Sequence, residues 1–298
     1  MVVGGAGIRA RESQAPIQLL LADDSGIIST ATGFIFECGG RGFLITNWHN
    51  VSGKHFLSGE LLNGRAPVFL RARLATEIGG QGDFTTVPHR VELYNPDSGA
   101  PLWYEHPDYG SRCDVVALPF ARPASTPANL HVPANRIHNI AIPVRPGSTV
   151  FILGFPRNLS VHIGWPLWKS GYIASEPHYD VMVGGKLQEV GGHSGGTVLP
   201  AFFIDALTRS GMSGAPVFAN YTGNWDMTDP YRSVDPTQPG FHDRDDVALG
   251  ENRLEFVGAY SSRVPTEEGE AALGLCFKVG AIAEICSSAV LGKHPHFV

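Results

Sequence analysis

The chain has 298 residues with a net charge of −6, and 43% of its residues are hydrophobic. This length suffices for one large domain or two smaller ones, and the 36 glycines and 22 prolines favour many short strands over long helices. The modest charge without a basic stripe excludes nucleic acid as an expected partner, and no apolar run approaches the roughly 18 residues of a membrane-spanning helix.

The first half of the chain has the pattern of a small antiparallel barrel. Residues 1–15 are interpreted as a loose N-terminal leader, and residues 16–125 as the barrel. Short apolar runs punctuated by Gly, Pro and polar residues predict its strands. These runs are 17–21, 33–37, 42–46, 67–74, 87–93 and 114–119. Residues 126–147 lie in a proline-rich stretch, so we interpret them as a linker.

The second half, residues 148–278, repeats this pattern and predicts a second barrel. Its strand-like runs are 149–154, 169–175, 180–183, 187–190, 197–204, 215–219, 254–261 and 273–278. Apolar residues at helical spacing over 279–290 predict a closing helix, with the tail reaching residue 298.

Two stretches, 53–66 and 220–252, are expected to be long loops. The second holds many aspartates, yet they show no spacing typical of calcium ligands. We therefore expect a solvated acidic loop and no metal site.

Residues 211–218 read Gly-Met-Ser-Gly-Ala-Pro-Val-Phe, which suggests a nucleophilic serine. A serine hydroxyl reacts only when a base removes its proton and nearby amides stabilise the developing charge. Gly211 and Gly214 can adopt backbone angles closed to other residues, so successive N–H groups can point at one spot. This predicts Ser213 as the nucleophile, with the N–H groups of Gly211 and Ser213 as the oxyanion hole. The same residue types also form ordinary turns, so residues upstream must decide.

Two upstream residues supply the base and the acid that such a serine needs. His49 follows the apolar run 43–46 at a polar corner, and Asp114 directly precedes another apolar run. We expect Asp114 to orient the imidazole, and His49 to take the proton of Ser213 and later give it to the leaving group. Asp108 is the alternative acid.

In this order, the motifs resemble the trypsin/chymotrypsin-like serine peptidases, most closely the bacterial intracellular and HtrA-type members. The matching segments are 33–36, 44–49, 114–118, 150–156, 170–175 and 205–214, within a resemblance that covers residues 30–290. It implies an all-β fold of two antiparallel β-barrels of the chymotrypsin type with a C-terminal α-helix. It also implies a serine endopeptidase that cleaves polypeptides through an acyl-enzyme, without a cofactor and without an appended PDZ module.

The resemblance also implies where the primary specificity pocket lies. Its floor is six residues before the serine, at Leu207. Its walls come from Tyr260, Ser261, Ser262, Arg263 and Gly274. An apolar floor favours a small or medium apolar side chain, because burying an unpaired charge is costly. Arg263, if it reached into the pocket, would favour an acidic side chain instead.

Several positions depart from the family pattern. Met212 replaces the aspartate that pairs with a newly cleaved N-terminus in the digestive enzymes, so we do not read Val2–Gly5 as a zymogen signal. Ala215 replaces a second glycine, and Asn50 replaces a cysteine that forms a disulfide in secreted relatives. We infer that the four cysteines (Cys38, Cys113, Cys276 and Cys286) are reduced and, as no signal peptide is visible, that the protein is cytoplasmic.

Other functions stay open. Met212 and Ala215 could distort the oxyanion turn and leave a degenerate binding module, or an unknown partner could activate the enzyme by ordering its loops. A remote alternative is an α/β-hydrolase elbow at 192–196 with Ser194 as the nucleophile. The β-branched, proline-stopped segment after it argues against that reading, because the elbow needs a following helix.

Overall fold

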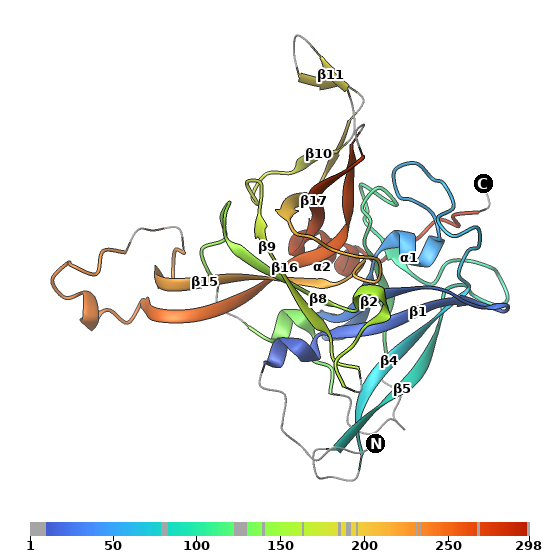
Figure 1. The fold of residues 1–298 in the computed structure, drawn as a ribbon, viewed down its shortest axis with the longest axis horizontal. Helices are drawn as coiled ribbons and strands as arrows, with labels where there is room; N and C mark the ends of the chain where they lie inside the picture. The colour runs from blue at the N-terminus through green and yellow to red at the C-terminus, as the bar shows by residue number, and fades with distance from the viewer. Residues whose placement is uncertain are drawn as a thin grey trace.

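The computed structural model describes residues 10–78, 83–121, 130–138, 141–162, 164–183, 186–188, 192–194, 196–230, 232, 234–266 and 269–296 (Figure 1). Most of the predicted leader, including Val2–Gly5, lies outside these residues, as does the start of the predicted linker. The predicted all-β double-barrel fold with a C-terminal helix is confirmed, and every predicted strand overlaps an observed one.

The first unit is an eight-stranded antiparallel sheet in the order β18-β6-β7-β3-β2-β1-β4-β5. Its strands are β1 (Pro16–Asp23), β2 (Gly26–Cys38), β3 (Arg41–Thr46), β4 (Phe69–Ile78), β5 (Asp83–Glu92), β6 (Tyr104–Glu105), β7 (Val116–Pro119) and β18 (Val290–Leu291). A 3₁₀ turn, η1 (Arg11–Gln14), precedes β1. Alternate residues of β1, namely Ile17, Leu19 and Leu21, are buried, so this face of the strand forms the core.

The second unit is a closed barrel in the order β14-β17-β16-β15-β8-β9. Its strands are β8 (Thr149–Gly154), β9 (Leu167–Ile173), β14 (Ala201–Asp205), β15 (Pro216–Asp226), β16 (Val247–Thr266) and β17 (Gly269–Lys278). Two short ribbons extend from it: β10 (Val181–Val183) pairs with β13 (Thr197–Leu199), and β11 (Lys186–Gln188) pairs with β12 (Gly192–Ser194).

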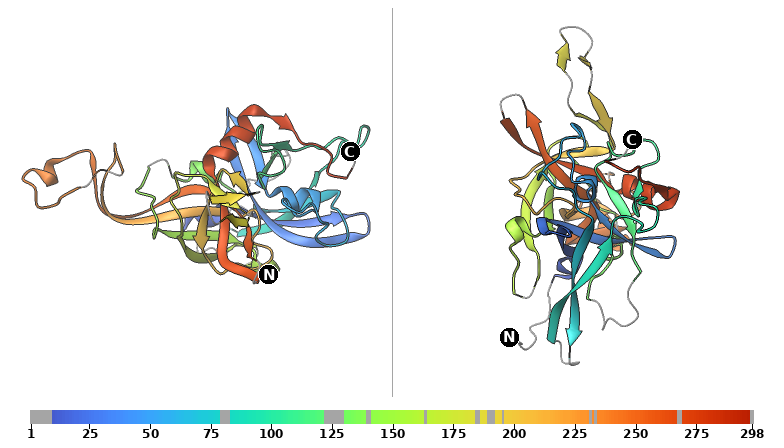
Figure 2. Two further views of the ribbon diagram at one scale, coloured as in Figure 1. Left: turned by 90° about the horizontal axis from the view of Figure 1, so that it is seen from above. Right: turned by 90° about the vertical axis from the view of Figure 1, so that its right-hand side faces the viewer.

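The closing helix α2 (Val279–Ser288) returns to the first unit (Figure 2). Its apolar face, with Ile282, Ile285 and Cys286, is buried in the same core as the first sheet. Beyond the helix, β18 pairs with β6, an edge pairing that the sequence pattern did not reveal. No helix among the described residues is long and apolar enough to cross a membrane. All four cysteines are free.

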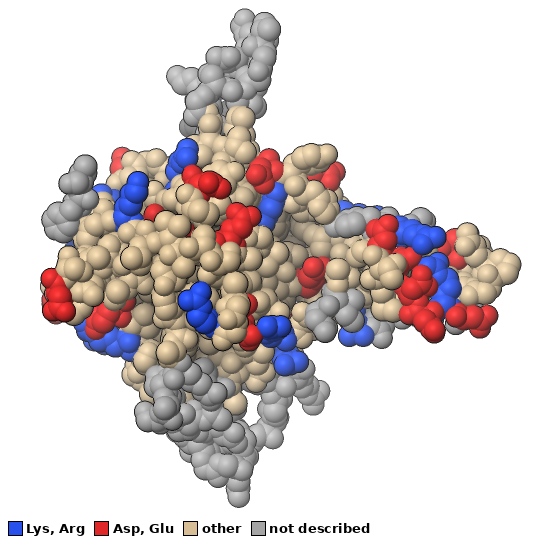
Figure 3. All heavy atoms as spheres, turned by 180° about the vertical axis from the view of Figure 1, so that it is seen from behind, with Lys and Arg blue, Asp and Glu red and all other residues tan. Residues whose placement is uncertain are grey.

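A long hairpin takes up the two ends of the stretch that was expected to be an acidic loop over 220–252, and the described residues between Asp226 and Val247 contain no strand. β15 and β16 stay paired from Asn220 opposite Leu254 out to Asp226 opposite Val247, and they form the orange arm in Figure 1. Its polar composition hides the strand pattern. At its end the buried Asp226 carboxylate accepts hydrogen bonds from Thr228 and Arg244, and Figure 3 shows acidic and basic side chains side by side on the arm. The described residues contain no group of His, Cys, Asp or Glu suited to a metal ion.

His131 anchors the linker to the first sheet. The Ala75 N–H donates to His131 Nε2 at 3.0 Å, and His131 Nδ1 lies 3.1 Å from the Gln14 carbonyl oxygen. One ring nitrogen thus accepts and the other donates, which is the pattern of a neutral imidazole. Burial lowers the pKa of His131 from 6.5 to about 4.

This buried histidine predicts a loss of stability in acid. Between pH 6.5 and about 4 the unfolded chain binds a proton at His131 that the folded chain does not, so the free energy of unfolding falls over that window. The full shift corresponds to about 3 kcal/mol. Urea unfolding at several pH values should give a steeper fall for the natural protein than for His131→Gln. An equal dependence of the free energy of unfolding on pH in the two proteins would contradict this role of His131.

Candidate active site

His49 lies on a short helix directly after a central strand. β3 ends at Thr46, and α1 (Trp48–Ser52) starts two residues later, where a loop was expected. Gly53 ends the helix with a φ of +73°, and a Cβ there would lie 3.0 Å from Pro67. The side chain of Asn47 donates a 2.6 Å hydrogen bond to the Asp114 carbonyl oxygen. The helix that carries His49 is therefore joined to the segment that carries Asp114.

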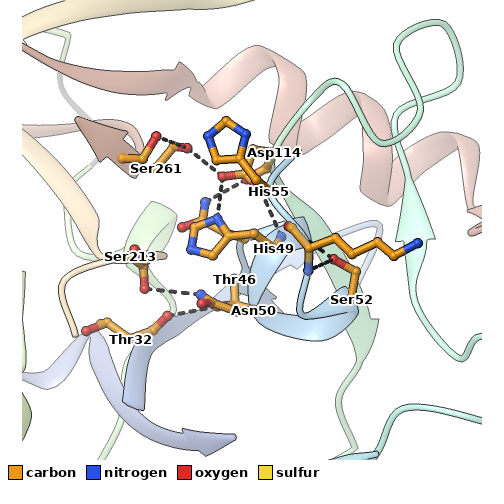
Figure 4. A network of polar contacts seen from close by, with 12 residues as sticks. Thr32, Thr46, His49, Asn50, Ser52, His55, Asp114, Ser213 and Ser261 are labelled. Carbon is orange, nitrogen blue, oxygen red and sulfur yellow. Dashed lines mark hydrogen bonds and ion pairs between the residues drawn. The ribbon is translucent and has the colours of Figure 1, made fainter. Parts of the chain in front are cut away.

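Asp114 is completely buried and holds the His49 side chain (Figure 4). Its Oδ1 accepts from the His49 backbone N–H at 2.9 Å, and its Oδ2 lies 2.7 Å from His49 Nδ1. Ser261 Oγ donates to the same Oδ2 at 2.5 Å. An ionised carboxylate only accepts, so Nδ1 carries the hydrogen and Nε2 is left as the acceptor. Three donors thus hydrogen-bond this buried carboxylate, whose burial without partners would cost free energy of folding.

Ser213 lies on the other side of the imidazole from Asp114 (Figure 4). Ser213 and His49 line one cleft of about 250 Å³, together with Asn50, Ser210 and Gly211. Among the described residues, no hydrogen bond joins the Ser213 hydroxyl to His49. Catalytic hydrogen bonds are often long in ligand-free enzymes and tighten when substrate binds.

Two glycines give the turn around Ser213 its shape. Gly211 has a φ of +94° and Gly214 a φ of +82°. A Cβ on Gly211 would lie 2.3 Å from the Phe155 carbonyl oxygen, and one on Gly214 would lie 2.1 Å from that of Thr32. Within the described part of the chain, the N–H groups of Gly211 and Ser213 make no hydrogen bond. Two free donors are therefore available beside the serine.

The unusual residues of this turn are accommodated in the barrel core. Met212 and Ala215 are fully buried there. The Ala215 N–H donates to the Met212 carbonyl oxygen at 2.9 Å, and this main-chain hydrogen bond closes the turn. Both side chains pack in this apolar core, and neither lines the cleft beside Ser213.

Polar contacts across the two units fasten this turn, and the sequence did not indicate them. The Thr32 N–H donates to the Ser213 carbonyl oxygen at 2.9 Å, and Thr32 Oγ1 donates to that of Gly211 at 2.7 Å. Asn50 Nδ2 bonds Thr46 Oγ1 at 3.0 Å and reaches the Ser213 carbonyl oxygen at 3.4 Å. The only signal in the sequence was Asn50 itself, which stands where secreted relatives have a cysteine.

The prediction that Leu207 forms the pocket floor is wrong, because that side chain is 58% exposed. Its neighbours Ala206 and Thr208 are 3% and 1% exposed, as in an extended segment whose side chains alternate. The residue six positions before Ser213 therefore faces outward. The buried Thr208 hydroxyl bonds the Tyr260 hydroxyl at 2.5 Å.

The expected pocket walls divide between two roles. Ser261 is fully buried and its hydroxyl is hydrogen-bonded to Asp114, so it does not form a wall. The Tyr260 ring packs against Gly274, where a Cβ would lie 2.8 Å from Cε2. Ser262 and Arg263 are partly buried beside them.

The remaining alternatives for catalytic residues receive no support. Asp108 is exposed, and no contact joins its side chain to His49 in the described structure. Gly195 and the side chain of Ser194 lie outside the described residues, but β13 follows them as a strand. An α/β-hydrolase elbow requires a helix there.

A sequence profile of the trypsin-like peptidase domain matches residues 31–225, most of the chain. The chain belongs to the trypsin-like peptidase family. No curated protein sequence matches this peptidase.

Several solved structures resemble this trypsin-like peptidase. The active form of the Rv3671c protease of Mycobacterium tuberculosis has 14% identity and a TM-score of 0.46, over 95% of this chain and 83% of that one. The HtrA-type protease AlgW with a tripeptide has 12% identity and a TM-score of 0.44, over 94% and 61%. A serine endoprotease of Yersinia pestis has 13% identity and a TM-score of 0.42, over 95% and 68%.

The contacts of Asp114 predict a large effect of an amide at this position. In Asp114→Asn, an amide can present an N–H toward Nδ1 and stabilise the wrong imidazole tautomer, so the turnover of this peptidase should fall by roughly four orders of magnitude. Peptide hydrolysis measured for this variant and for Asp108→Asn, a matched change at an exposed carboxylate, checks this. Equal activities of the two variants would contradict the role of Asp114.

Proposed function

We propose that this protein is a serine endopeptidase in which Ser213, His49 and Asp114 form the catalytic triad. The observation that carries the proposal is the hydrogen-bonded Asp114, which leaves His49 Nε2 as an acceptor on the side of Ser213. The N–H groups of Gly211 and Ser213, which make no hydrogen bond within the described residues, support it further.

The reaction follows from these positions. His49 Nε2 takes the proton of the Ser213 hydroxyl as Oγ attacks the carbonyl carbon of the substrate. The carbonyl oxygen becomes an oxyanion, which the N–H groups of Gly211 and Ser213 stabilise. The C–N bond then breaks, and protonated His49 gives its proton to the leaving amine. Water attacks the acyl-enzyme by the same route, releasing the acid and restoring Ser213.

We propose that β16 binds the substrate backbone. Its pairing with β17 is interrupted between Tyr260 and Arg263, so Ser261 and Ser262 have no partner in that ladder. An irregularity of this kind leaves main-chain groups available for an extended peptide. The position next to the Ser213 turn supports this, because the Gly214 N–H bonds the Tyr260 carbonyl oxygen at 2.9 Å.

We propose that the primary pocket accepts small apolar side chains. The support is the buried Tyr260 ring, which packs against Gly274 and whose hydroxyl is held by the buried Thr208 hydroxyl. A bulky side chain would have to displace the tyrosine ring, and a charged one would be buried without a partner.

The positive φ angles of Gly211 and Gly214 and the burial of Met212 and Ala215 in the barrel core favour a competent peptidase over a degenerate module. The four free cysteines, three of them buried, favour a reducing, cytoplasmic location.

Labelling with a fluorophosphonate probe tests the nucleophile. Ser213 should be modified rapidly because base and oxyanion donors activate it. Ser213→Ala should not be labelled, and Ser98→Ala, a matched loss of an exposed hydroxyl outside the cleft, should label like the natural protein. A probe adduct on another residue, or none, would refute the proposed function.

A substrate library tests the pocket. Tyr260→Ala should raise kcat/KM for peptides with a large apolar side chain at the cleavage site by at least about 10-fold relative to small ones. Leu207→Ala should leave the preference unchanged because its side chain points outward. A large change with Leu207→Ala and none with Tyr260→Ala would reverse the assignment.

A further inference from the structure

The orientation of the peptide between Ser210 and Gly211 decides whether the oxyanion hole exists. The Arg157 N–H donates to the Ser210 carbonyl oxygen at 2.7 Å. In a planar trans peptide the C=O and N–H groups point in opposite directions, so this bond also fixes the direction of the Gly211 N–H. If the peptide rotated, a carbonyl oxygen would replace a donor beside Ser213.

The segment that supplies this bond has a sterically disfavoured backbone. Arg157 has φ 52° and ψ 34°, and the next residue, Asn158, has a φ of 64°. Two consecutive non-glycine residues in the left-handed region persist only where surrounding contacts hold them. A specific contact is therefore expected at this turn, which follows β8.

That contact comes from the first barrel. Gln18 on β1 is 2% exposed, and its Nε2 donates to Asn158 Oδ1 at 2.7 Å and to the Asn158 carbonyl oxygen at 3.4 Å. Gln18 Oε1 accepts from Arg73 Nη1 at 3.0 Å, and Arg73 Nη2 donates to Thr86 Oγ1 at 3.0 Å. A guanidinium group only donates, so Arg73 fixes which end of the Gln18 amide faces Asn158.

We propose that Gln18 and Asn158 form a clamp through which the first barrel holds the oxyanion hole of the second barrel in its competent form. The clamp keeps residues 157–158 in the left-handed conformation, Arg157 then holds the Ser210 carbonyl, and the Gly211 N–H faces the cleft. Both are positioning residues, since neither lines the cleft beside Ser213. The inference rests on the proposed function.

A double-mutant cycle tests the clamp with peptide hydrolysis as the readout. Asn158→Ala and Gln18→Met each remove the bond, and kcat should fall by about 10- to 100-fold with KM little changed, somewhat less than the roughly 100- to 1,000-fold that outright loss of an oxyanion donor costs. The double variant should lose no more than either single one, because both changes break the same bond. Asn158→Asp keeps an acceptor for Gln18 and should retain activity.

Two controls separate this effect from simple destabilisation. Asn135→Ala removes another amide contact of the first barrel, with the backbone of Glu37, and should leave kcat unchanged. Thermal unfolding of every variant shows whether the fold is intact, and the pH profile should keep its shape because His49 and Asp114 are untouched.

The outcomes are distinct. Unchanged kcat in Asn158→Ala with an active natural protein overturns the clamp and leaves the proposed function standing. Multiplicative losses in the double variant, or equal losses in Asn158→Asp and Asn158→Ala, also overturn it. A natural protein that neither hydrolyses peptides nor reacts with a fluorophosphonate at Ser213 refutes the proposed function and the clamp with it.

Discussion

The arrangement of the site depends on the hydrogen bonds that the buried Asp114 carboxylate accepts. It receives His49 from the first barrel and Ser261 from the second, so one charged group joins the two units at the cleft. A buried carboxylate without donors would be costly, and each barrel supplies part of what it needs. The packing of the two barrels against each other therefore also sets the orientation of the His49 imidazole.

The nucleophile turn shows the same dependence. Its glycines allow the backbone to bend, but the carbonyl groups of Gly211 and Ser213 are held by Thr32 of the first barrel. The Gln18–Asn158 bond adds a further contact between the units. Neither barrel holds all of these residues, and small relative movements of the two would displace His49, Ser213 and the Gly211 N–H group together.

Much of the architecture was predictable from local patterns. Alternating apolar runs located the strands, and the spacing of Ile282, Ile285 and Cys286 located the closing helix. The arm formed by β15 and β16 was missed because its residues are largely polar and the strands are held by pairing with each other. Leu207 was misplaced for a related reason, since a one-residue difference in an extended segment reverses the side that a residue faces.

The sequence by itself determined the strands, the glycine turn at 211–214 and the three residue types suited to proton transfer, because these depend on neighbours along the chain. Only the tertiary structure decided which side chains meet. Ser261 lies 147 positions from Asp114, and Gln18 lies 140 positions from Asn158. Contacts of this kind arise from the packing of one barrel against the other, and no local pattern of residues specifies them.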